Sequence, residues 1–432
     1  MNYTDNTYHF RQDSTFLYYF GIQRPGLVAL IDLEKGREVI YGEEYTVEDY
    51  VWRGPQPTIL DQAALCGIEE VRPTKELSTI LSQAQASSTP IHFLPLYRAE
   101  NQQKLQSWLD IHPQEIMSKR SLDLVRAVIS QREYKSQEEI EQLHQAVDVS
   151  VEMHVAAMRF AQPGMTEAQV TAEIHRVALA AGGNISFPII ATKDGQTLHN
   201  HYHGNTIQAG DLFLVDAGFE NPMAYAGDLS STFPVSPTFT PRQKDIYQLT
   251  LDAHQAAIDA LGLGIPFKAA HIAACSTIFD GLKDMGLTKG NTEDAVEAGA
   301  HALFFPCGTG HMMGLDVHDM EDLGEVWVGY EGQAKSTQFG LKSLRLAKPL
   351  EVGHVITIEP GIYFIPELMD LWRGQGKFNE FIDWDQVDAY RNFGGIRNEE
   401  DFVMTEEGAQ LLGKPKPKTI SDIESIRTEA YA

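Results

Sequence analysis

The stretch GDLFLVDAGFENPMAYAGDLSSTF, residues 210–233, decides the fold of the larger part of this 432-residue chain. Two runs of strand-forming residues flank Asn221-Pro222, which predicts a β-hairpin with its turn near residue 222. The mean of 216 and 228 is also 222, so a symmetric turn would place Asp216 directly opposite Asp228. Like charges that face each other across two strands are destabilising. We therefore expect one acid to be solvated or hydrogen-bonded, or a cation to lie between them.

Composition limits the function classes. The length favours two domains, and 43% hydrophobic with 22% charged residues is typical of a globular protein. The sequence has no apolar run of about 18 residues, so we expect no transmembrane helix. The formal net charge of −26 argues against a nucleic acid or an anionic membrane as partner, because phosphate contacts need Lys and Arg. This charge makes a small or metal-mediated substrate the expectation. Three cysteines and no recognisable signal peptide favour a reducing compartment, so we expect a cytoplasmic protein.

The chain changes texture near residue 136. Residues 1 to about 120 alternate short apolar runs with helical stretches, which predicts an α/β N-terminal domain. Ser136 and Thr166 then each precede a helical pattern with a Glu or Gln three residues later, as in a capping box. Pro163-Gly164 and Gly182-Gly183 are expected to end these two helices.

A repeat indicates an internal duplication. Helical patterns at 241–261 and 267–282 follow the hairpin, and strands are expected from residue 301 onward. The segments IQAGDLFLVDAG (207–218) and LEVGHVITIEPG (350–361) share one pattern, and they align Asp216 with Glu359 at an offset of 359 − 216 = 143. Two halves of two helices and strands ending in a carboxylate predict an α+β domain with a pseudo-twofold axis.

The segment CGTGHMMGLDVHD, residues 307–319, contains His311 and His318 seven positions apart. Its glycines argue against a helix. In an extended segment an odd offset places the two rings on opposite faces unless a loop or bulge intervenes. We expect different roles for the two histidines, and a buried, hydrogen-bonded core histidine is the alternative for either.

The segment GGIRNEEDFVMT, residues 394–405, adds further acids, with Arg397, Glu399 and Asp401 on one side of an extended chain. A solvated strand end is the alternative. The candidate ligands are four carboxylates and one or two imidazoles, and two divalent cations would neutralise the four negative charges. A ligand set rich in oxygen and without thiolate favours Mn²⁺ over a structural zinc. Such a pair holds a bridging water, generates hydroxide and polarises a carbonyl or phosphoryl oxygen. The predicted reaction class is hydrolysis, of either an amide or a phosphoester.

Five ordered motifs, VDAG (215–218), GDLSSTFPV (227–235), GTGHMMGLDVHD (308–319), TIEPGIY (357–363) and GIRNEED (395–401), resemble those of the pita-bread metallopeptidases, specifically aminopeptidase P and prolidase. FRQDSTFLYYFG (10–21) resembles their N-terminal domain, so the resemblance covers nearly the whole chain. It implies a creatinase/prolidase-type domain over 1–125 and a pita-bread, creatinase/aminopeptidase-like catalytic domain over 136–432. In relatives an initial helix and strand precede this N-terminal segment, so that domain is expected to be truncated or naturally short.

The resemblance also implies roles for individual residues. The implied metal ligands are Asp216, Asp228, His311, Glu359 and Glu399, with Asp228 and Glu399 bridging two ions. Glu359 would also accept the proton of the bridging water. His318 and His199 would contact the substrate, Tyr363 would line the site, and Arg397 would support the bridging carboxylate or reach the substrate. A small gap in the alignment with the family would place His201 or His203 at this position instead of His199.

The implied enzyme is an aminopeptidase that uses two divalent ions, Mn²⁺ with Co²⁺ or Zn²⁺ as alternatives, and a metal-bridging hydroxide to release an N-terminal residue before proline. An Xaa-Pro dipeptidase stays open, and a metal-free binding module with this fold is a remoter alternative. Relatives imply a homodimer or homotetramer. Three positions depart from the family pattern: Asn398 where Ile or Val is usual, Ser231 where Arg is frequent, and Cys307 where His is frequent.

Overall fold

The computed structural model describes residues 6–432, and the chain divides into two compact units, residues 1–132 and 133–432. Within the described residues, no helix combines the length and the apolar character needed to cross a membrane.

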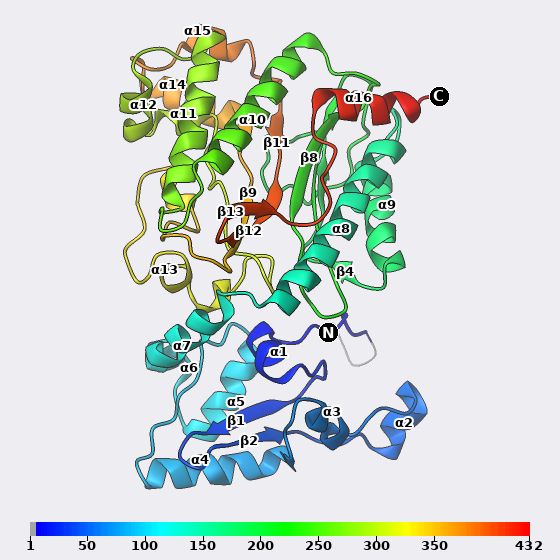
Figure 1. Ribbon diagram of the computed structural model, residues 1–432, viewed down its shortest axis with the longest axis vertical. Helices are drawn as coiled ribbons and strands as arrows, with labels where there is room; N and C mark the ends of the chain where they lie inside the picture. The colour runs from blue at the N-terminus through cyan, green and yellow to red at the C-terminus, as the bar shows by residue number, and fades with distance from the viewer. Residues whose placement is uncertain (1–5) are drawn as a thin grey trace. The chain divides into compact units, whose positions relative to one another are not determined.

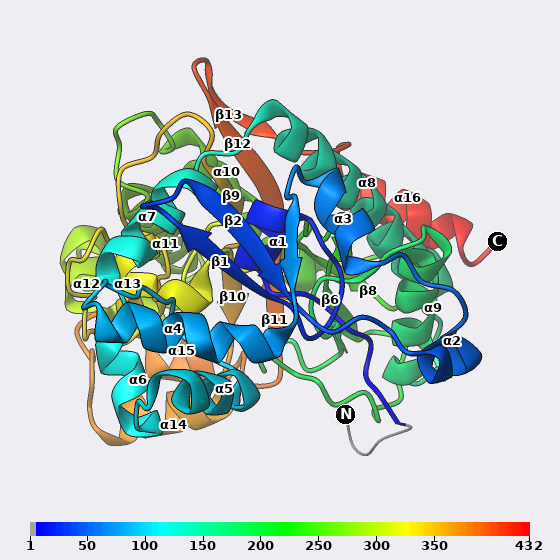
Figure 2. The same cartoon turned by 90° about the horizontal axis from the view of Figure 1, so that it is seen from below.

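The first unit is built on a three-stranded sheet in the order β1-β2-β3 (Figure 2). Strand β1 (Val28–Asp32) is antiparallel to β2 (Arg37–Tyr41), and β3 (Glu70–Arg72) is parallel to β2. Alternate residues of β2 serve two hydrophobic clusters. Val39 and Tyr41 pack with residues of α4 and α5, whereas Ile40 packs with residues of α1 and α3. The sheet therefore has helices on both faces, as the α/β pattern predicts. The helices are α1 (Ser14–Phe20), α2 (Val47–Arg53), α3 (Ile59–Leu65), α4 (Leu77–Ala86), α5 (Ala99–Leu109), α6 (Pro113–Lys119) and α7 (Leu122–Arg132), with the 3₁₀ turn η1 (Thr74–Glu76).

The second unit begins with two predicted helices. Helix α8 (Gln137–Phe160) follows Ser136, and α9 (Glu167–Ala180) follows Thr166, each with both hydrogen bonds of a capping box. Helices α10 (Pro241–Asp259) and α11 (Lys268–Asp284) form the corresponding pair in the second half. In Figure 1 the strands lie between α8 and α9 on one side and α10 and α11 on the other.

Two antiparallel sheets carry the repeat. One has the order β5-β6-β8, with β5 (Ile190–Thr192), β6 (Leu212–Ala217) and β8 (Leu229–Pro234). The other has the order β13-β12-β9, with β9 (Val355–Ile358), β12 (Glu400–Thr405) and β13 (Gly408–Leu411). Strands β6 and β9 begin 355 − 212 = 143 residues apart, which is the offset of the sequence repeat.

The remaining elements connect or cover these sheets. The two-stranded pairs are β4 (Asn184–Ile185) with β7 (Phe219–Glu220) and β10 (Gly361–Tyr363) with β11 (Gly395–Arg397). The shorter helices are α12 (Thr292–Ala298), η2 (Ala300–Leu303), η3 (Glu321–Leu323), α13 (Glu325–Val328), η4 (Leu341–Ser343), α14 (Pro366–Gly374), α15 (Trp384–Asp388) and α16 (Ile420–Glu429).

The hairpin register differs from the symmetric prediction. Asp216 pairs with Ser230, not with Asp228, so the pairing is centred on residue 223 and Asp228 lies just before β8. The connection forms a turn of its own. The Asn221 side chain accepts hydrogen bonds from the backbone of Met223 and Tyr225, at 3.0 Å each. Asn221 thus fixes a turn that displaces the centre of the hairpin by one residue.

The expectation of strands from residue 301 onward is also wrong. Residues 301–350 form turns, short 3₁₀ helices and the short helix α13, and the next strand begins at Val355. Near His311 the segment meets β9 through an isolated bridge, Met312 to Ile356, and through backbone hydrogen bonds such as that from the N–H of Thr357 to the carbonyl of His311 at 3.0 Å. The close approach needs glycine, because a Cβ on Gly310 would lie 2.0 Å from the carbonyl oxygen of Thr357. The glycines thus allow the backbone of this segment to approach β9 closely without forming a regular strand.

Candidate metal centre

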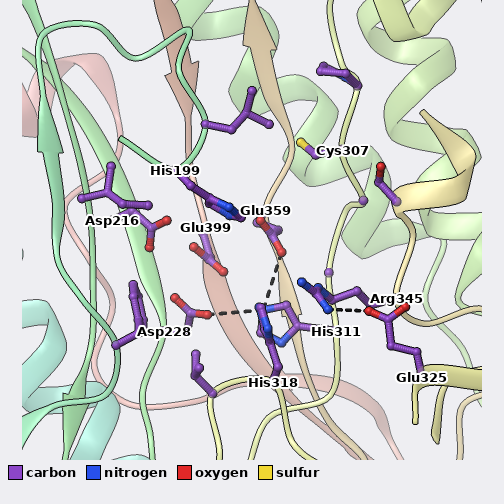
Figure 3. Close-up of a pocket in the computed structure, with 18 of the residues that line it drawn as sticks. His199, Asp216, Asp228, Cys307, His311, His318, Glu325, Arg345, Glu359 and Glu399 are labelled. Carbon is purple, nitrogen blue, oxygen red and sulfur yellow. Dashed lines mark hydrogen bonds and ion pairs between the residues drawn. The ribbon is translucent and has the colours of Figure 1, made fainter. Parts of the chain in front are cut away.

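Four acids from separate strand ends converge on one imidazole (Figure 3). Asp216 is on β6, Asp228 precedes β8, Glu359 follows β9 and Glu399 precedes β12. The Nε2 atom of His311 lies 3.3 Å from Oδ2 of Asp228 and 3.6 Å from Oε1 of Glu359. Asp228, His311 and Glu399 each offer a donor atom within 4.8 Å of the others. The structure therefore brings together all five residues predicted as ligands.

A buried arginine orients two of these acids. Nη2 of Arg397 lies 2.6 Å from Oδ2 of Asp216, and Nε donates to the hydroxyl of Ser230 at 2.9 Å. That hydroxyl in turn donates to Oε2 of Glu399 at 2.8 Å. Ser230 was not among the predicted site residues. Its role follows from the hairpin register, because Ser230 is the residue opposite Asp216.

The electrostatics favour a bound cation. Burial, together with the charges of Asp216 and other acids, raises the pKa of Asp228, and burial beside Asp228 and Glu359 does the same to the pKa of Glu399. Burial also raises the pKa of Glu359, although His311 opposes this shift. Buried carboxylates in such a group are stable as anions only if cations compensate them.

Two carboxylate oxygens show that protein groups alone do not satisfy the cluster. Oδ1 of Asp216 and Oδ1 of Asp401 are buried and make no hydrogen bond. Asp401 accepts from the backbone N–H of Asp228 at 3.1 Å with its other oxygen, so it fixes the chain at that acid. The orphaned oxygen of Asp216 and the oxygen-rich donor set fit divalent cations of the hard to borderline class.

The two histidines of residues 307–319 lie together, because a loop intervenes between them. The ring centroids of His311 and His318 are 4.4 Å apart. Nδ1 of His318 lies 2.8 Å from Oε2 of Glu321, and the His318 side chain remains 30% exposed. Burial and the neighbouring His311 lower the pKa of His318, and the bond to His318 lowers the pKa of Glu321 to about 2. His318 is thus oriented by one carboxylate and open to the pocket.

A pocket of about 900 Å³ opens over the acids and contains both predicted substrate-contacting histidines, His199 and His318. His199 has an exposed side chain, and its partial burial lowers its pKa. His201 also lines the pocket, whereas His203 faces the carbonyl of Ile189, with Nε2 at 3.1 Å. His199 and His201 thus line the pocket and His203 does not, and Figure 3 shows the His199 side chain close to Asp216 and Glu359.

Tyr363 and Arg397 lie behind the surface of this pocket. Tyr363 on β10 is fully buried, and its hydroxyl accepts a hydrogen bond from Nη1 of Arg397 at 3.0 Å. Neither residue belongs to the pocket lining. The prediction that Tyr363 lines the site is therefore corrected: pairing of β10 with β11 turns the side chain inward, where it holds Arg397 against Asp216.

The wider part of the pocket carries charges that the sequence did not single out. Arg345 pairs with Oε1 of Glu321 at 2.7 Å and also with Glu325, and Lys335 pairs with Glu325. Glu321 and Glu325 begin the short helices η3 and α13, and Lys335 and Arg345 lie in irregular chain before β9. This region has no hydrophobic periodicity that would have indicated these residues. The apolar lining includes Phe187, Ile190, Leu198, Val317 and Phe339.

A buried lysine behind the acids explains two departures from the family pattern. Nζ of Lys416 lies 3.1 Å from the hydroxyl of Ser231 and 3.1 Å from Oδ1 of Asn398, and it also contacts the carbonyl of Ser230. Burial lowers the pKa of Lys416 to about 8. Ser231 and Asn398 are therefore two side-chain partners of one buried amine.

Comparisons with known proteins agree with this architecture. A model of metallopeptidase family M24 matches residues 141–406, and a model of the aminopeptidase P N-terminal domain matches residues 1–92. Human Xaa-Pro dipeptidase is 29% identical over 98% of this chain and 85% of its own length, and a Xaa-Pro aminopeptidase of Haemophilus influenzae is 30% identical over 98% and 89%. The aminopeptidase PepP of Pseudomonas aeruginosa has a TM-score of 0.80 at 26% identity, covering 98% of this chain and 90% of that one. This chain belongs to metallopeptidase family M24, with the pita-bread fold and the aminopeptidase P type of N-terminal domain.

Proposed function

We propose that this enzyme is a dinuclear-metal aminopeptidase that hydrolyses the N-terminal Xaa-Pro bond of peptides. The convergence of Asp216, Asp228, Glu359 and Glu399 on His311, with a buried oxygen of Asp216 left unpaired, is the observation that carries the proposal. The relatives named Xaa-Pro aminopeptidase and Xaa-Pro dipeptidase supply the substrate class.

These five residues would hold two divalent ions, for which we propose Mn²⁺, with Co²⁺ or Zn²⁺ as alternatives. When bound, the ions would lower the pKa of a water molecule and polarise the scissile carbonyl. The residues around them have separate tasks. Asp216 and Asp228 have nearly buried side chains, 12% and 7% exposed, and are suited to holding cations.

Glu359 is the best-placed proton acceptor. Its side chain is 22% exposed toward the pocket, more than those of Asp216 and Asp228, so water can reach it. We propose that this carboxylate takes up the proton of the attacking water. Glu321 opposes the lowering of the His318 pKa, and a protonated His318 would donate a hydrogen bond to the developing negative charge on the substrate.

A bond before proline needs a site of this kind. An Xaa-Pro bond has no amide N–H, so an enzyme cannot recognise that bond through a donor at this position. The acidic centre offers a negatively charged region for the free α-amine of the substrate, and apolar side chains such as Phe187 and Phe339 offer surface for a proline ring. The proposed substrate is therefore a small peptide with proline second.

The charges in the pocket favour an aminopeptidase over a dipeptidase. Arg345 and Lys335 are the basic side chains among the described pocket-lining residues, and both already pair with Glu321 or Glu325. The free carboxylate of an Xaa-Pro dipeptide would have to displace one of these acids. A longer peptide carries its carboxylate farther from the scissile bond and avoids this competition.

Hydrolysis of matched peptides tests the proposal. Protein stripped of metal and reloaded with Mn²⁺ should cleave an Xaa-Pro-Yaa tripeptide and spare the Xaa-Pro dipeptide. Preference for the dipeptide would assign a dipeptidase instead. If two Mn²⁺ ions bind and neither peptide is cleaved, the substrate assignment is wrong while the metal centre stands.

We further propose domain limits of 1–125 and 136–432, a cytoplasmic location, and assembly into a homodimer or homotetramer. Light scattering of the purified chain tests the assembly directly. A monomer that cleaves the tripeptide at full rate would contradict it without affecting the proposed reaction.

A further inference from the structure

A second cluster of metal-binding side chains lies outside the acidic centre. His271 and Cys275 are four residues apart on α11, which places them on one face of the helix, and His301 comes from η2. One donor atom from each residue lies within 4.8 Å of the other two, and Sγ of Cys275 is 3.5 Å from Nε2 of His271. All three side chains are at most 1% exposed.

The protein leaves part of this cluster unsatisfied. Both ring nitrogens of His301 are buried without a hydrogen bond. Burial lowers the pKa of His301 to about 4, and the smaller, opposing effect of the Val296 carbonyl does not offset this shift. Burial of an imidazole without a hydrogen-bond partner is unfavourable. Coordination by a cation would remove that penalty.

His271 is already oriented for coordination. Its Nδ1 is 2.8 Å from the hydroxyl of Thr309, which leaves Nε2 on the side of the Cys275 sulfur. A hydrogen bond at one ring nitrogen that fixes the other is the arrangement usual for metal-binding histidines. Burial also lowers the pKa of His271 to about 3, so its ring is neutral and able to coordinate near pH 7.

The donor set selects a different cation from that of the acidic centre. Two imidazole nitrogens and one sulfur suit Zn²⁺ and similar thiophilic ions, whereas carboxylate oxygens suit Mn²⁺. A bound cation also favours the thiolate form of cysteine, and the thiolate offsets part of the ionic charge. The two clusters therefore differ in the metal that they prefer.

We propose that His271, Cys275 and His301 form a separate site for one Zn²⁺ ion. The site would act structurally on the segment that precedes His311. Thr309, in this segment, connects the proposed zinc site to the acidic centre. Its hydroxyl contacts His271, and its carbonyl accepts a hydrogen bond from the backbone N–H of Glu359 at 2.7 Å. The bound ion holds α11 and η2 against this segment, and the inference does not depend on the identity of the peptide substrate.

Cobalt spectroscopy tests the site in the full chain. The acidic centre is first filled with Mn²⁺, Co²⁺ is then added, and the thiolate-to-Co²⁺ charge-transfer band is recorded before displacement with Zn²⁺. Three matched variants divide the cysteines: Cys275→Ser, Cys307→Ser in the catalytic pocket, and Cys66→Ser, an exposed thiol of the first unit. Metal content per chain is measured on the same samples.

We expect the band in the wild type, in Cys66→Ser and in Cys307→Ser, and its loss in Cys275→Ser together with about one equivalent of Zn²⁺. A wild-type protein without the band, or a band that survives Cys275→Ser, would overturn the proposal. Loss in Cys307→Ser alone would place the thiophilic ion in the catalytic pocket instead. If Cys275→Ser does not fold, His301→Gln decides, because it should keep the band but weaken Zn²⁺ binding about tenfold or more.

Discussion

The two halves of the catalytic unit use one repeated pattern in different ways. Asp216 lies within β6, the middle strand of its sheet, and is paired on both sides, with Ile190 and Ser230. Glu359, its equivalent 143 residues later, follows β9, an edge strand that ends at Ile358. The first half thus fixes its acid in a sheet, while the second half leaves its acid partly open to the pocket.

A single residue type accounts for much of this difference. Asp216 is followed by Ala217, which continues the strand, whereas Glu359 is followed by Pro360. Proline has no backbone N–H and cannot continue a central ladder. The strand therefore ends before Glu359, so the duplication yields one acid held within a sheet and one carboxylate that water can reach. Under the proposed reaction, both halves supply metal ligands, but only the acid of the second half also accepts a proton.

The largest effect is expected from breaking the first half. Asp228→Asn removes one charge and one candidate bridging ligand from a side chain only 7% exposed. We expect kcat/KM for the tripeptide to fall about 10³-fold, equivalent to about 4 kcal/mol. Because asparagine is a poor bridge between cations, the metal content should also fall below two ions per chain. Kinetics and metal analysis on the same protein measure both.

Asp211→Asn is the matched control, since Asp211 directly precedes β6 and its side chain accepts a hydrogen bond from the backbone N–H of Gln208. Its activity and metal content should stay within about twofold of the wild type, as for most surface substitutions. Equal losses in both variants would indicate general destabilisation of the hairpin and not a metal ligand at Asp228.

The hairpin also shows what the sequence could and could not predict. Strand-forming runs around Asn221 correctly place β6, and the repeat correctly places β9. The register depends on side-chain hydrogen bonds of Asn221 inside the turn, which residue type alone does not fix. The error mattered, because it concealed Ser230 as the residue that links Arg397 to Glu399.

The site shows a similar division. The acids and His311 stand in short motifs beside strands, so the sequence identifies them. Arg345 and Lys335 lie in irregular chain, and Lys416 lies in KPKPK, where basic residues usually indicate a solvated surface. Only the fold buries Lys416 among Ser231 and Asn398, and no local signal could have indicated that contact.

The second-largest effect is expected from the second half. Glu359→Gln keeps the size of the side chain but removes its ability to accept a proton. We expect kcat to fall about 10²- to 10³-fold, in the range of lost general base catalysis. Metal content should be retained better than in Asp228→Asn. If both variants lose metal equally, the two halves do not divide their roles as we infer.

The third prediction concerns the charges that only the second half contributes to the pocket. Glu325→Gln removes an acid that pairs with both Arg345 and Lys335. The side chains of Arg345 and Lys335 should then attract the carboxylate of a dipeptide. We expect the ratio of kcat/KM for the dipeptide to kcat/KM for the tripeptide to rise about threefold to tenfold, which is the effect of one exposed to half-buried ion pair.

Arg345→Gln is the opposing variant. It should lower cleavage of the dipeptide without raising that of the tripeptide, because it removes a cation from the same pocket. An unchanged ratio in both variants would mean that the peptide carboxylate does not reach these residues, and the preference between peptides would then have another origin.

The smallest effect on activity is expected at Lys416, which joins the two halves through Ser231 and Asn398. Lys416→Met should lower kcat/KM only about threefold, since the amine touches none of the proposed ligands. Its effect on stability should depend on pH. The pKa of Lys416 is about 8 in the folded protein and 10.5 in its ordinary state, because burial disfavours the charged form.

Between pH 8 and 10.5 the unfolded chain retains a proton that folded Lys416 releases, so this group makes the protein more stable as pH rises through that window. The free energy of unfolding of the wild type relative to Lys416→Met should therefore rise by up to about 3 kcal/mol across it. Urea unfolding at several pH values measures this difference, with Lys414→Met as the control because the side chain of Lys414 is 41% exposed. A flat difference, or the same slope for Lys414→Met, would show that Lys416 keeps its proton in the fold, and that the two halves meet around a permanently charged amine.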